Sequence, residues 1–138
     1  VIQQRAPDQR GAIAHHGNRN SDWSLEQAGG NVAGETHFQS NADDDAVELT
    51  LNSGLNYILA GRIAGSTRFF AATSSMGTVS TSGDGVSIAA GSKTMYVGAS
   101  DGDEASNAYI GEIIYYNRSL ESAEQEQVLS YLRARWGI

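Results

Sequence analysis

Turn-forming residues interrupt the apolar runs of this chain at short intervals. Sixteen Gly, together with many Ser, Thr, Asn and Asp, separate runs of only a few apolar residues. Short runs of this kind are typical of strands, and turns spaced roughly 8–12 residues apart are typical of a sandwich or barrel. The spacing therefore predicts an all-β, antiparallel sandwich for most of the chain.

The alternation of apolar and polar side chains within the runs predicts which strands have one solvent-exposed face. Val47, Leu49 and Leu51 are separated by Glu48 and Thr50, so one face of that strand is expected in the core. The run from 56 to 63 is apolar on both alternating sets, as in a central strand, and the Ser/Thr/Gly-rich segment 73–82 is typical of an exposed hairpin. The expected strands are residues 1–5, 12–16, 23–27, 36–39, 46–51, 56–63, 68–73, 78–81, 86–89, 94–98 and 108–117.

Only the last stretch changes its period. Its apolar residues fall on one helical face: Val128, Leu129, Leu132 and Trp136. Ser122 followed by Gln125 is a capping-box pattern, and Gly137 is a typical stop, so a helix is predicted over Ser122–Trp136. Because a helix of about fifteen residues is marginal alone in water, its apolar face is expected to dock on the sheet.

Length and composition fit one domain over residues 1–138. Without Cys there is no disulfide or thiolate metal site, and no run reaches the roughly 18 apolar residues of a membrane span. The chain opens at Val1 without an initiator Met, already in an expected strand, which predicts a fragment of a longer polypeptide.

Charge excludes two classes of partner. The net charge is −7 and the pI about 4.7, with Lys93 and eight scattered Arg as the cationic residues. Because no Arg cluster forms a stripe that could track phosphates, nucleic acid is a poor partner. An acidic surface also argues against binding to anionic membranes.

The end of the chain combines a strand, a turn and a helix in one pattern. Tyr109-Ile-Gly-Glu-Ile-Ile-Tyr-Tyr-Asn-Arg-Ser-Leu120 is followed by Glu121-Ser-Ala-Glu-Gln-Glu-Gln-Val128 and by Tyr131-Leu-Arg-Ala-Arg-Trp-Gly137. This pattern resembles the end of concanavalin A-like (laminin-G-like) jelly-roll domains of the phage and bacterial type, and Met95-Tyr-Val-Gly98 resembles their preceding strand.

The resemblance implies a jelly-roll sandwich of two antiparallel sheets, with rim loops available to ligands and the N-terminal strand missing. Family members occur in extracellular proteins, on bacterial surfaces and in virions, and most are binding or structural modules. An extracellular, cell-surface or virion location is therefore expected, and the fold alone leaves the ligand open.

Catalytic motifs do not stand out. The glucanase branch of the family carries a Glu-x-Asp-x-x-Glu pattern on one strand, whereas Glu48 and Glu112 each lack a partner at i+2. No Gly-x-Ser-x-Gly elbow is present either. The sequence therefore predicts a protein that is not an enzyme, with a glycan-active enzyme domain as a remaining alternative.

A sugar site is predicted around Trp23. Sugars bind to exposed aromatic rings flanked by polar side chains, and Asn18, Asn20 and Asp22 supply such groups beside this indole. The alternative is that Trp23 is a core residue of its strand.

Calcium is the one cofactor considered, although none is required. Asp101 and Asp103 with Asn107 are an oxygen-rich set that could hold it, while solvated turn acids are the alternative. His15 and His16, with His37 as a third ligand, make a poor metal site because adjacent strand residues point to opposite faces.

Two functions follow. The chain is either a recognition module that binds glycans or another surface through its rim loops, or a structural module that lies against other protein subunits of a larger assembly. Glycan binding predicts an exposed Trp or Tyr with polar neighbours, whereas assembly predicts an apolar surface that faces other chains.

Overall fold

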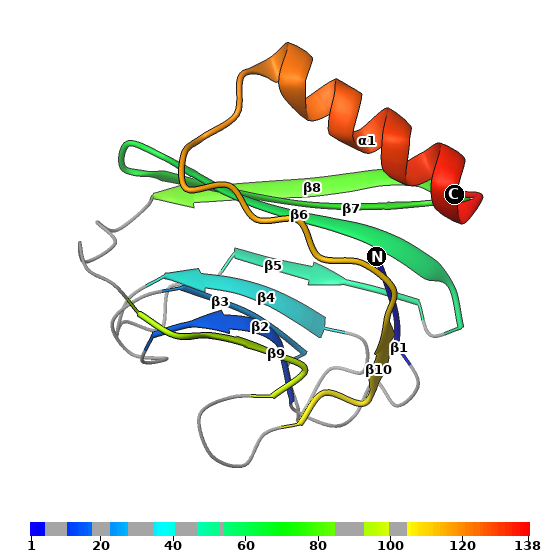
Figure 1. Ribbon diagram of the computed structural model, residues 1–138, viewed down its shortest axis with the longest axis horizontal. Coiled ribbons are helices and arrows are strands. Elements are labelled where there is room, and N and C mark those ends of the chain that lie inside the picture. The colour runs from blue at the N-terminus through cyan, green and yellow to red at the C-terminus, as the bar shows by residue number, and fades with distance from the viewer. Residues whose placement is uncertain are drawn as a thin grey trace.

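The computed structural model describes residues 1–4, 11–17, 23–27, 35–40, 47–52, 54–84, 93–99 and 105–138. Within these ranges the strands form two antiparallel sheets of five strands each, followed by one C-terminal helix. The two sheets face each other, and the helix lies over the outer side of the first sheet (Figure 1). The predicted fold is thus confirmed as two stacked antiparallel sheets with a C-terminal helix.

The first sheet has the strand order β10-β1-β6-β7-β8. Its strands are β1 (Ile2–Gln4), β6 (Asn56–Ala64), β7 (Thr67–Ser74), β8 (Gly77–Asp84) and β10 (Ala108–Ile110). β7 and β8 pair along their whole length, so β8 is longer than the strand expected at 78–81. They turn at residues 75–76, which confirms the exposed hairpin.

The second sheet has the order β5-β4-β3-β2-β9. Its strands are β2 (Gly11–His16), β3 (Trp23–Gln27), β4 (Glu35–Ser40), β5 (Val47–Thr50) and β9 (Met95–Val97). The register between β2 and β3 shifts between Ala12 and Ala14, and Ile13, which lies at this irregularity, is buried in the core. The strand expected at 86–89 lies outside the described residues.

The core lies between the sheets and draws on both. One cluster of buried residues consists of Ile2, Ile13, Leu51, Tyr57 and Ala72, and a second consists of Phe38, Val47 and Phe70. In β5, Val47 is buried whereas Glu48 is only partly covered and Thr50 is exposed, so the predicted alternation is confirmed there.

Gly61 lets the two sheets approach each other. A Cβ at this position would lie 2.6 Å from Cε2 of Phe38, whose ring comes from the opposite sheet. The Phe38 ring therefore occupies the space that the side chain of any residue other than glycine at position 61 would need. Phe38 also contacts Phe70 of β7 at a ring-centroid distance of 6.3 Å, so one aromatic side chain ties the sheets together.

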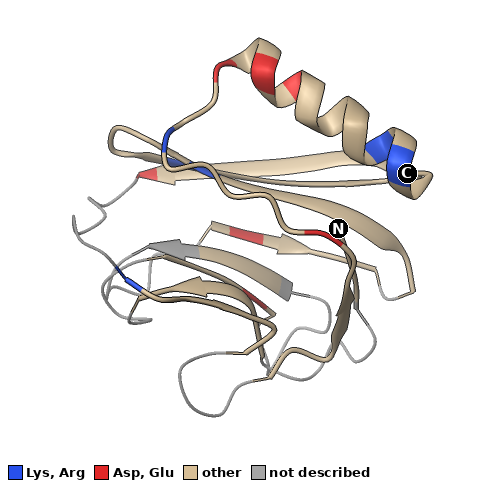
Figure 2. Ribbon diagram, in the orientation of Figure 1, with Lys and Arg blue, Asp and Glu red and all other residues tan. Residues whose placement is uncertain are grey.

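The helix α1 spans Ser122–Trp136, as its period predicted. Its cap differs by one residue from the expected Ser122–Gln125 box: Glu121 is the N-cap, and its backbone N–H donates to the Glu124 carboxylate at 2.9 Å. Gly137 ends the helix with a φ of 67°. Acidic residues gather at the start of the helix and basic residues in its last turn, where they suit the helix dipole (Figure 2).

The sequence-based expectation was wrong for the strand at 108–117. The ladder between β1 and β10 reaches Gly111, whose N–H donates to the Val1 carbonyl at 2.8 Å, and the chain then leaves the sheet. Residues 111–120 form a coil that crosses the front of the sandwich and rises to α1 (Figure 1). The physical reason is that Glu112 turns its carboxylate toward α1, as described below.

The helix covers only one end of the sheet beneath it. Tyr57 and Ile58 are both buried, and since neighbouring strand residues point to opposite faces, β6 is covered on both sides there. Farther along β6, Ala60 and Gly61 are exposed. The expectation of two buried faces is therefore right for Tyr57 and Ile58 and wrong for Ala60 and Gly61, while the other residues after Ile58 are partly buried.

Leu132→Ala should cost about 2–5 kcal/mol of unfolding free energy, the range for a truncated core Leu. Leu132 is 7% exposed and is the only buried residue of α1. Urea unfolding measures the loss, with Ser130→Ala on the exposed side of α1 as the control. A loss below about 0.5 kcal/mol, the usual surface range, would show that the helix is not docked through Leu132.

Candidate functional site

The coil 111–120 is fixed at its start by Glu112. One carboxylate oxygen of Glu112 accepts a hydrogen bond from the Tyr131 hydroxyl (3.0 Å), and the other accepts one from the Trp136 indole N–H (3.0 Å). Nε of Arg135 lies 3.2 Å from the same carboxylate. The bond from Trp136, followed by that from Tyr131 and the charge of Arg135, holds the pKa of Glu112 below its ordinary value.

Gly111 strengthens this first anchor by leaving room for the indole. A Cβ on Gly111 would lie 2.7 Å from the ring of Trp136. The Trp136 ring therefore packs directly on the backbone that carries Glu112. The chain is thus joined to the last two turns of α1 by packing and by hydrogen bonds at the same point.

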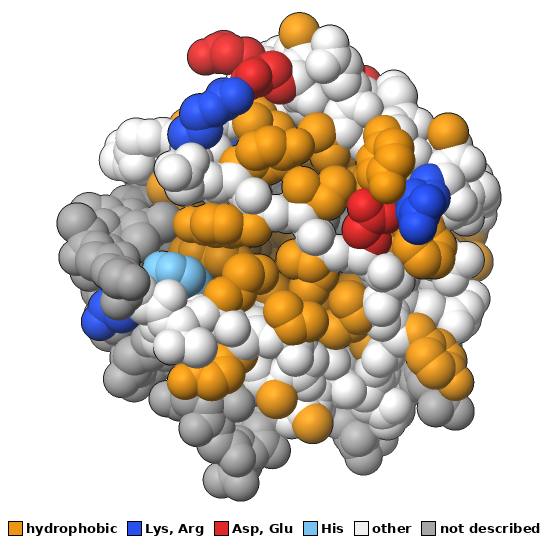
Figure 3. Space-filling view, viewed as in Figure 1, with side chains coloured by type: hydrophobic (Ala, Val, Ile, Leu, Met, Phe, Trp, Pro, Cys, Tyr) orange, Lys and Arg blue, Asp and Glu red, His pale blue; other side chains and the backbone are white. Residues whose placement is uncertain are grey.

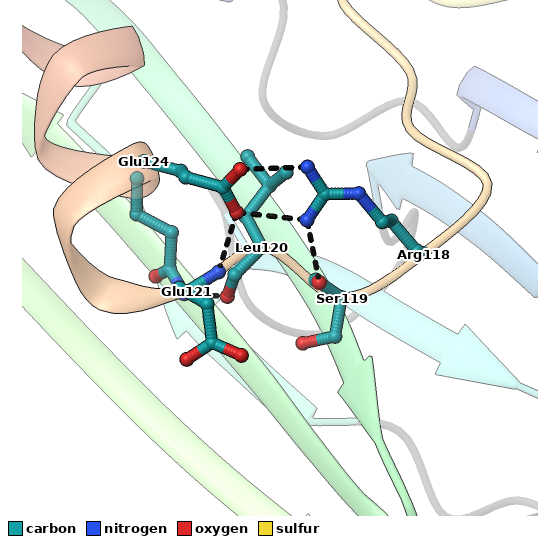
Figure 4. Close-up of polar contacts among 6 residues, drawn as sticks. Arg118, Ser119, Leu120, Glu121 and Glu124 are labelled. Atoms are coloured by element: carbon teal, nitrogen blue, oxygen red, sulfur yellow. Dashed lines mark hydrogen bonds and ion pairs between the residues drawn. The ribbon is translucent and has the colours of Figure 1, made fainter.

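The coil is fixed at its end by Arg118 and Glu124. The guanidinium makes two parallel hydrogen bonds to the carboxylate, 2.8 Å from Nη1 to Oε2 and 2.6 Å from Nη2 to Oε1 (Figure 4). The bonds from Arg118, followed by that from the Glu121 N–H, lower the pKa of Glu124 from 4.5 to about 2. Two anchors therefore hold residues 113–117 in place between them.

Between the anchors, Tyr115 completes a cluster of three aromatic rings. It lies against Trp23 at a centroid distance of 5.8 Å and against His16 at 6.3 Å, and His16 and Trp23 are 5.9 Å apart. The rings are inclined to one another by only 3–16°. We call His16, Trp23 and Tyr115 the aromatic cluster; it presents three nearly parallel rings from three separate parts of the chain.

The aromatic cluster is partly open to solvent. Tyr115 is 51% exposed, while His16 and Trp23 are half-buried. On its inner side the Trp23 ring contacts Phe38 at 6.5 Å, so the cluster is supported by the core. Trp23 is therefore partly a core residue, while its role as a sugar platform stays a prediction.

Further exposed apolar side chains lie on the coil and on the two elements that flank it, β10 and α1. We call them the apolar strip; its members are Tyr109, Ile113, Ile114, Tyr116 and, from α1, Tyr131. Figure 3 shows hydrophobic side chains gathered over the face that the coil crosses. Contiguous exposed apolar surface of this kind is typical of interaction sites.

Of the predicted sugar-binding residues, the structure places Trp23 alone. Asn18, Asn20 and Asp22 lie outside the described residues. The partners that the structure gives Trp23, His16 and Tyr115, were not in the predicted site, because residues 16 and 115 come together only through the fold.

Of the predicted calcium-binding residues, the structure places Asn107. Asp101 and Asp103 lie outside the described residues. Asn107 directly precedes β10, and its neighbour Ser106 donates its N–H to the Gly98 carbonyl at 2.8 Å. Within the described ranges, no three His, Asp or Glu side chains are placed to hold a metal.

The three histidines lie in different surroundings. His15 stacks on Tyr96 at 5.9 Å, whereas the adjacent His16 stacks on Trp23. Nε2 of His37 lies 3.3 Å from the Glu48 carboxylate. The prediction that the neighbouring His15 and His16 face opposite ways agrees with these contacts.

A buried polar pair was missed at the sequence level. His15 and Ser24 are opposite each other on β2 and β3, and both are 0% exposed. Neither the imidazole nitrogens nor the hydroxyl has a hydrogen-bond partner among the described residues. No local sequence signal points to this pair, because it arises from the register of two strands.

The two strand carboxylates considered for catalysis are engaged elsewhere. Glu48 contacts His37 in the second sheet, while Glu112 is bound to three residues of α1 beside the first sheet. A glycosidase needs two carboxyl groups facing one cleft about 5–9.5 Å apart. These two carboxylates do not form such a pair.

The chain matches no family model, no curated protein and no solved structure. Within the described part of the chain, no helix is long and apolar enough to cross a bilayer.

The Arg118–Glu124 anchor should make stability depend on pH in a defined direction. Because the folded pKa of Glu124, about 2, lies below its ordinary value of 4.5, the stabilisation is fully present above pH 4.5 and is lost as pH falls toward 2. Urea unfolding of the native protein and Glu124→Gln between pH 7 and pH 2.5 should give a free-energy difference that is largest above pH 4.5 and shrinks below it.

Glu126→Gln, an exposed carboxylate on the same helix, is the matched control, and its difference from the native protein should stay smaller across the whole range. A difference between the native protein and Glu124→Gln that is constant with pH would contradict the role given to Arg118.

Proposed function

We propose that this chain is a non-catalytic recognition module that binds glycans at the aromatic cluster. The observation that supports this most directly is the set of three nearly parallel rings whose outer member, Tyr115, is half exposed. Sugar rings pack their C–H faces on flat aromatic surfaces, and the hydroxyl of Tyr115 adds a hydrogen-bonding group.

The anchoring of the coil suits this function. Tyr115 lies in a segment without regular structure, yet Glu112 and Arg118 fix both of its ends to α1. A ring held in position before binding loses less conformational entropy when a ligand arrives. The two anchors therefore preorganise Tyr115 for binding, which favours affinity for a sugar ring.

The family inferred for the chain is the concanavalin A-like, laminin-G-like jelly-roll family. Two facing antiparallel sheets are compatible with it, and the residues that carry the resemblance contact each other: Gly111 and Glu112 meet Tyr131 and Trp136. With this family we propose a cell-surface, extracellular or virion location.

Tyr115→Ser should lower glycan binding by roughly tenfold or more, the loss typical of a central aromatic contact. A glycan array identifies the bound saccharides, and titration with the strongest of them, followed by Trp fluorescence, measures the affinity. Met76→Ser is the matched control, because Met76 is 77% exposed in the β7–β8 turn, away from the cluster. The proposal would be wrong if the array showed no binding, or if Tyr115→Ser and Met76→Ser bound the saccharide with equal affinity.

The second candidate is a structural module that assembles with further copies of the chain. The apolar strip favours it, because Ile113 and Ile114 are aliphatic and offer a sugar no hydrogen bonds, whereas they suit a protein interface. A virion or surface lattice would bury this strip between subunits.

Assembly through the strip predicts concentration-dependent self-association that is lost in the Ile113→Ser/Ile114→Ser double variant. Sedimentation equilibrium from about 10 to 500 μM measures it, since interfaces with Kd values in this range bury modest areas. A native protein that sediments as a monomer throughout would rule out assembly of this kind and leave glycan recognition unaffected.

A further inference from the structure

We infer that a second site, separate from the aromatic cluster, lies in the depression between the first turns of α1 and the outer face of the first sheet, and that it takes a carboxylated sugar. The depression has a volume of about 310 Å³, near the lower end of the roughly 300–1,000 Å³ of small-ligand pockets. It exists because α1 docks through its C-terminal half, at Leu132 and Trp136, and covers only one end of β6.

The strand register gives the depression a defined floor. Alternate rows across β6, β7 and β8 contribute one side chain per strand to the outer face, because neighbouring strand residues point to opposite faces. Two such rows line the depression: Ala60, Ala71 and Ser80 in one, and Arg62, Phe69 and Ser82 in the other. The first row consists of small residues and leaves space for a ligand. The second row supplies a guanidinium, an aromatic ring and a hydroxyl group that can bind it.

Arg62 is the group that selects the ligand. Its guanidinium carbon lies 4.1 Å above the centre of the Phe69 ring, so the planar group is held flat on the phenyl face. Among the described residues, Arg62 has no carboxylate partner. Because stacking occupies a face of the guanidinium and leaves its N–H edge free, Arg62 is prepared to bind a carboxylate through two parallel hydrogen bonds.

The other polar groups of the depression suit hydroxyls. Ser80 and Ser82 are exposed on β8 and line the same depression as Arg62. Gln125 of α1 donates its amide N–H to the Leu120 carbonyl at 2.7 Å, which orients its side chain and leaves the amide oxygen as an acceptor. A guanidinium accompanied by hydroxyl and amide groups matches the carboxylate and hydroxyls of a sugar acid. A peptide would instead need apolar pockets for its side chains.

The chemistry of the ligand follows from these contacts. The carboxylate of a hexuronate would pair with Arg62 while its ring hydroxyls reach the serines and Gln125. In a protein of net charge −7, general electrostatic attraction for acids is absent, so any binding of an acidic sugar must come from a local cation. The inference is independent of the aromatic cluster, since none of its three rings lines the depression.

The test is a calorimetric titration of the full chain with trigalacturonate, using its fully methyl-esterified form as the neutral match. We expect binding of the acid and at least tenfold weaker binding of the ester. Arg62→Gln should weaken acid binding at least tenfold. Arg133→Gln, which makes the same charge change near the other end of α1, should leave it within twofold.

The Phe69→Leu variant separates two contributions to acid binding, the charge of Arg62 and the stacking of its guanidinium on the Phe69 ring. It keeps Arg62 but removes the ring beneath it, and we expect a several-fold loss for the acid with no effect on the ester. Circular dichroism spectra and unfolding midpoints of all variants should stay close to those of the native protein, because Arg62 and Phe69 are not buried.

Three results would overturn the inference: equal affinity for acid and ester, unchanged affinity in Arg62→Gln, or acetate competing as well as trigalacturonate does. The last would mean a bare carboxylate site, as for a peptide C-terminus. Tyr115→Ser should leave trigalacturonate binding unchanged, so failure of the aromatic cluster as a sugar site and failure of this site can be told apart.

Discussion

The carboxylate of Glu112 joins the first sheet, the coil and the helix. It binds Tyr131, Trp136 and Arg135 of α1 from a position directly after β10, so the sheet, the coil and the helix meet at one side chain. A helix of fifteen residues with one buried apolar side chain has little stability of its own. Its position, the course of the coil and the exposure of Tyr115 therefore all depend on this contact.

Periodicity predicted the helix within its observed bounds because its apolar residues lie on one face, and Gly137 ends it in a left-handed conformation. The sequence pattern predicted the N-cap at Ser122, one residue after the observed N-cap, Glu121. Ser122 and Gln125 match a capping pattern, but Glu124 is held by Arg118, and a side chain six residues away is invisible to a local pattern. A side-chain contact from just outside the capping pattern therefore favours one of two plausible local caps.

The run from 108 to 117 shows a different limit. Its apolar composition suggested a strand, yet Ile113, Ile114, Tyr115 and Tyr116 are all exposed to a third or more of their area. Sequence alone cannot distinguish apolar residues that face a core from those that face an empty surface. Two further features could not be predicted for a related reason, because their members meet only in the fold. Strand pairing brings together Arg62, Phe69 and Ser82, whereas the course of the coil brings Tyr115 to His16 and Trp23.

A segment tied down at both ends has a consequence for how this protein can change. The anchors at Glu112 and Arg118 lie outside residues 113–117, and the rest of the fold draws little on these five positions. Substitutions there can alter what the surface recognises while the frame keeps its shape, as in the hypervariable loops of antibody domains. The coil is thus a natural place for specificity to diverge between related chains, and an accessible position for grafting or randomising a binding sequence.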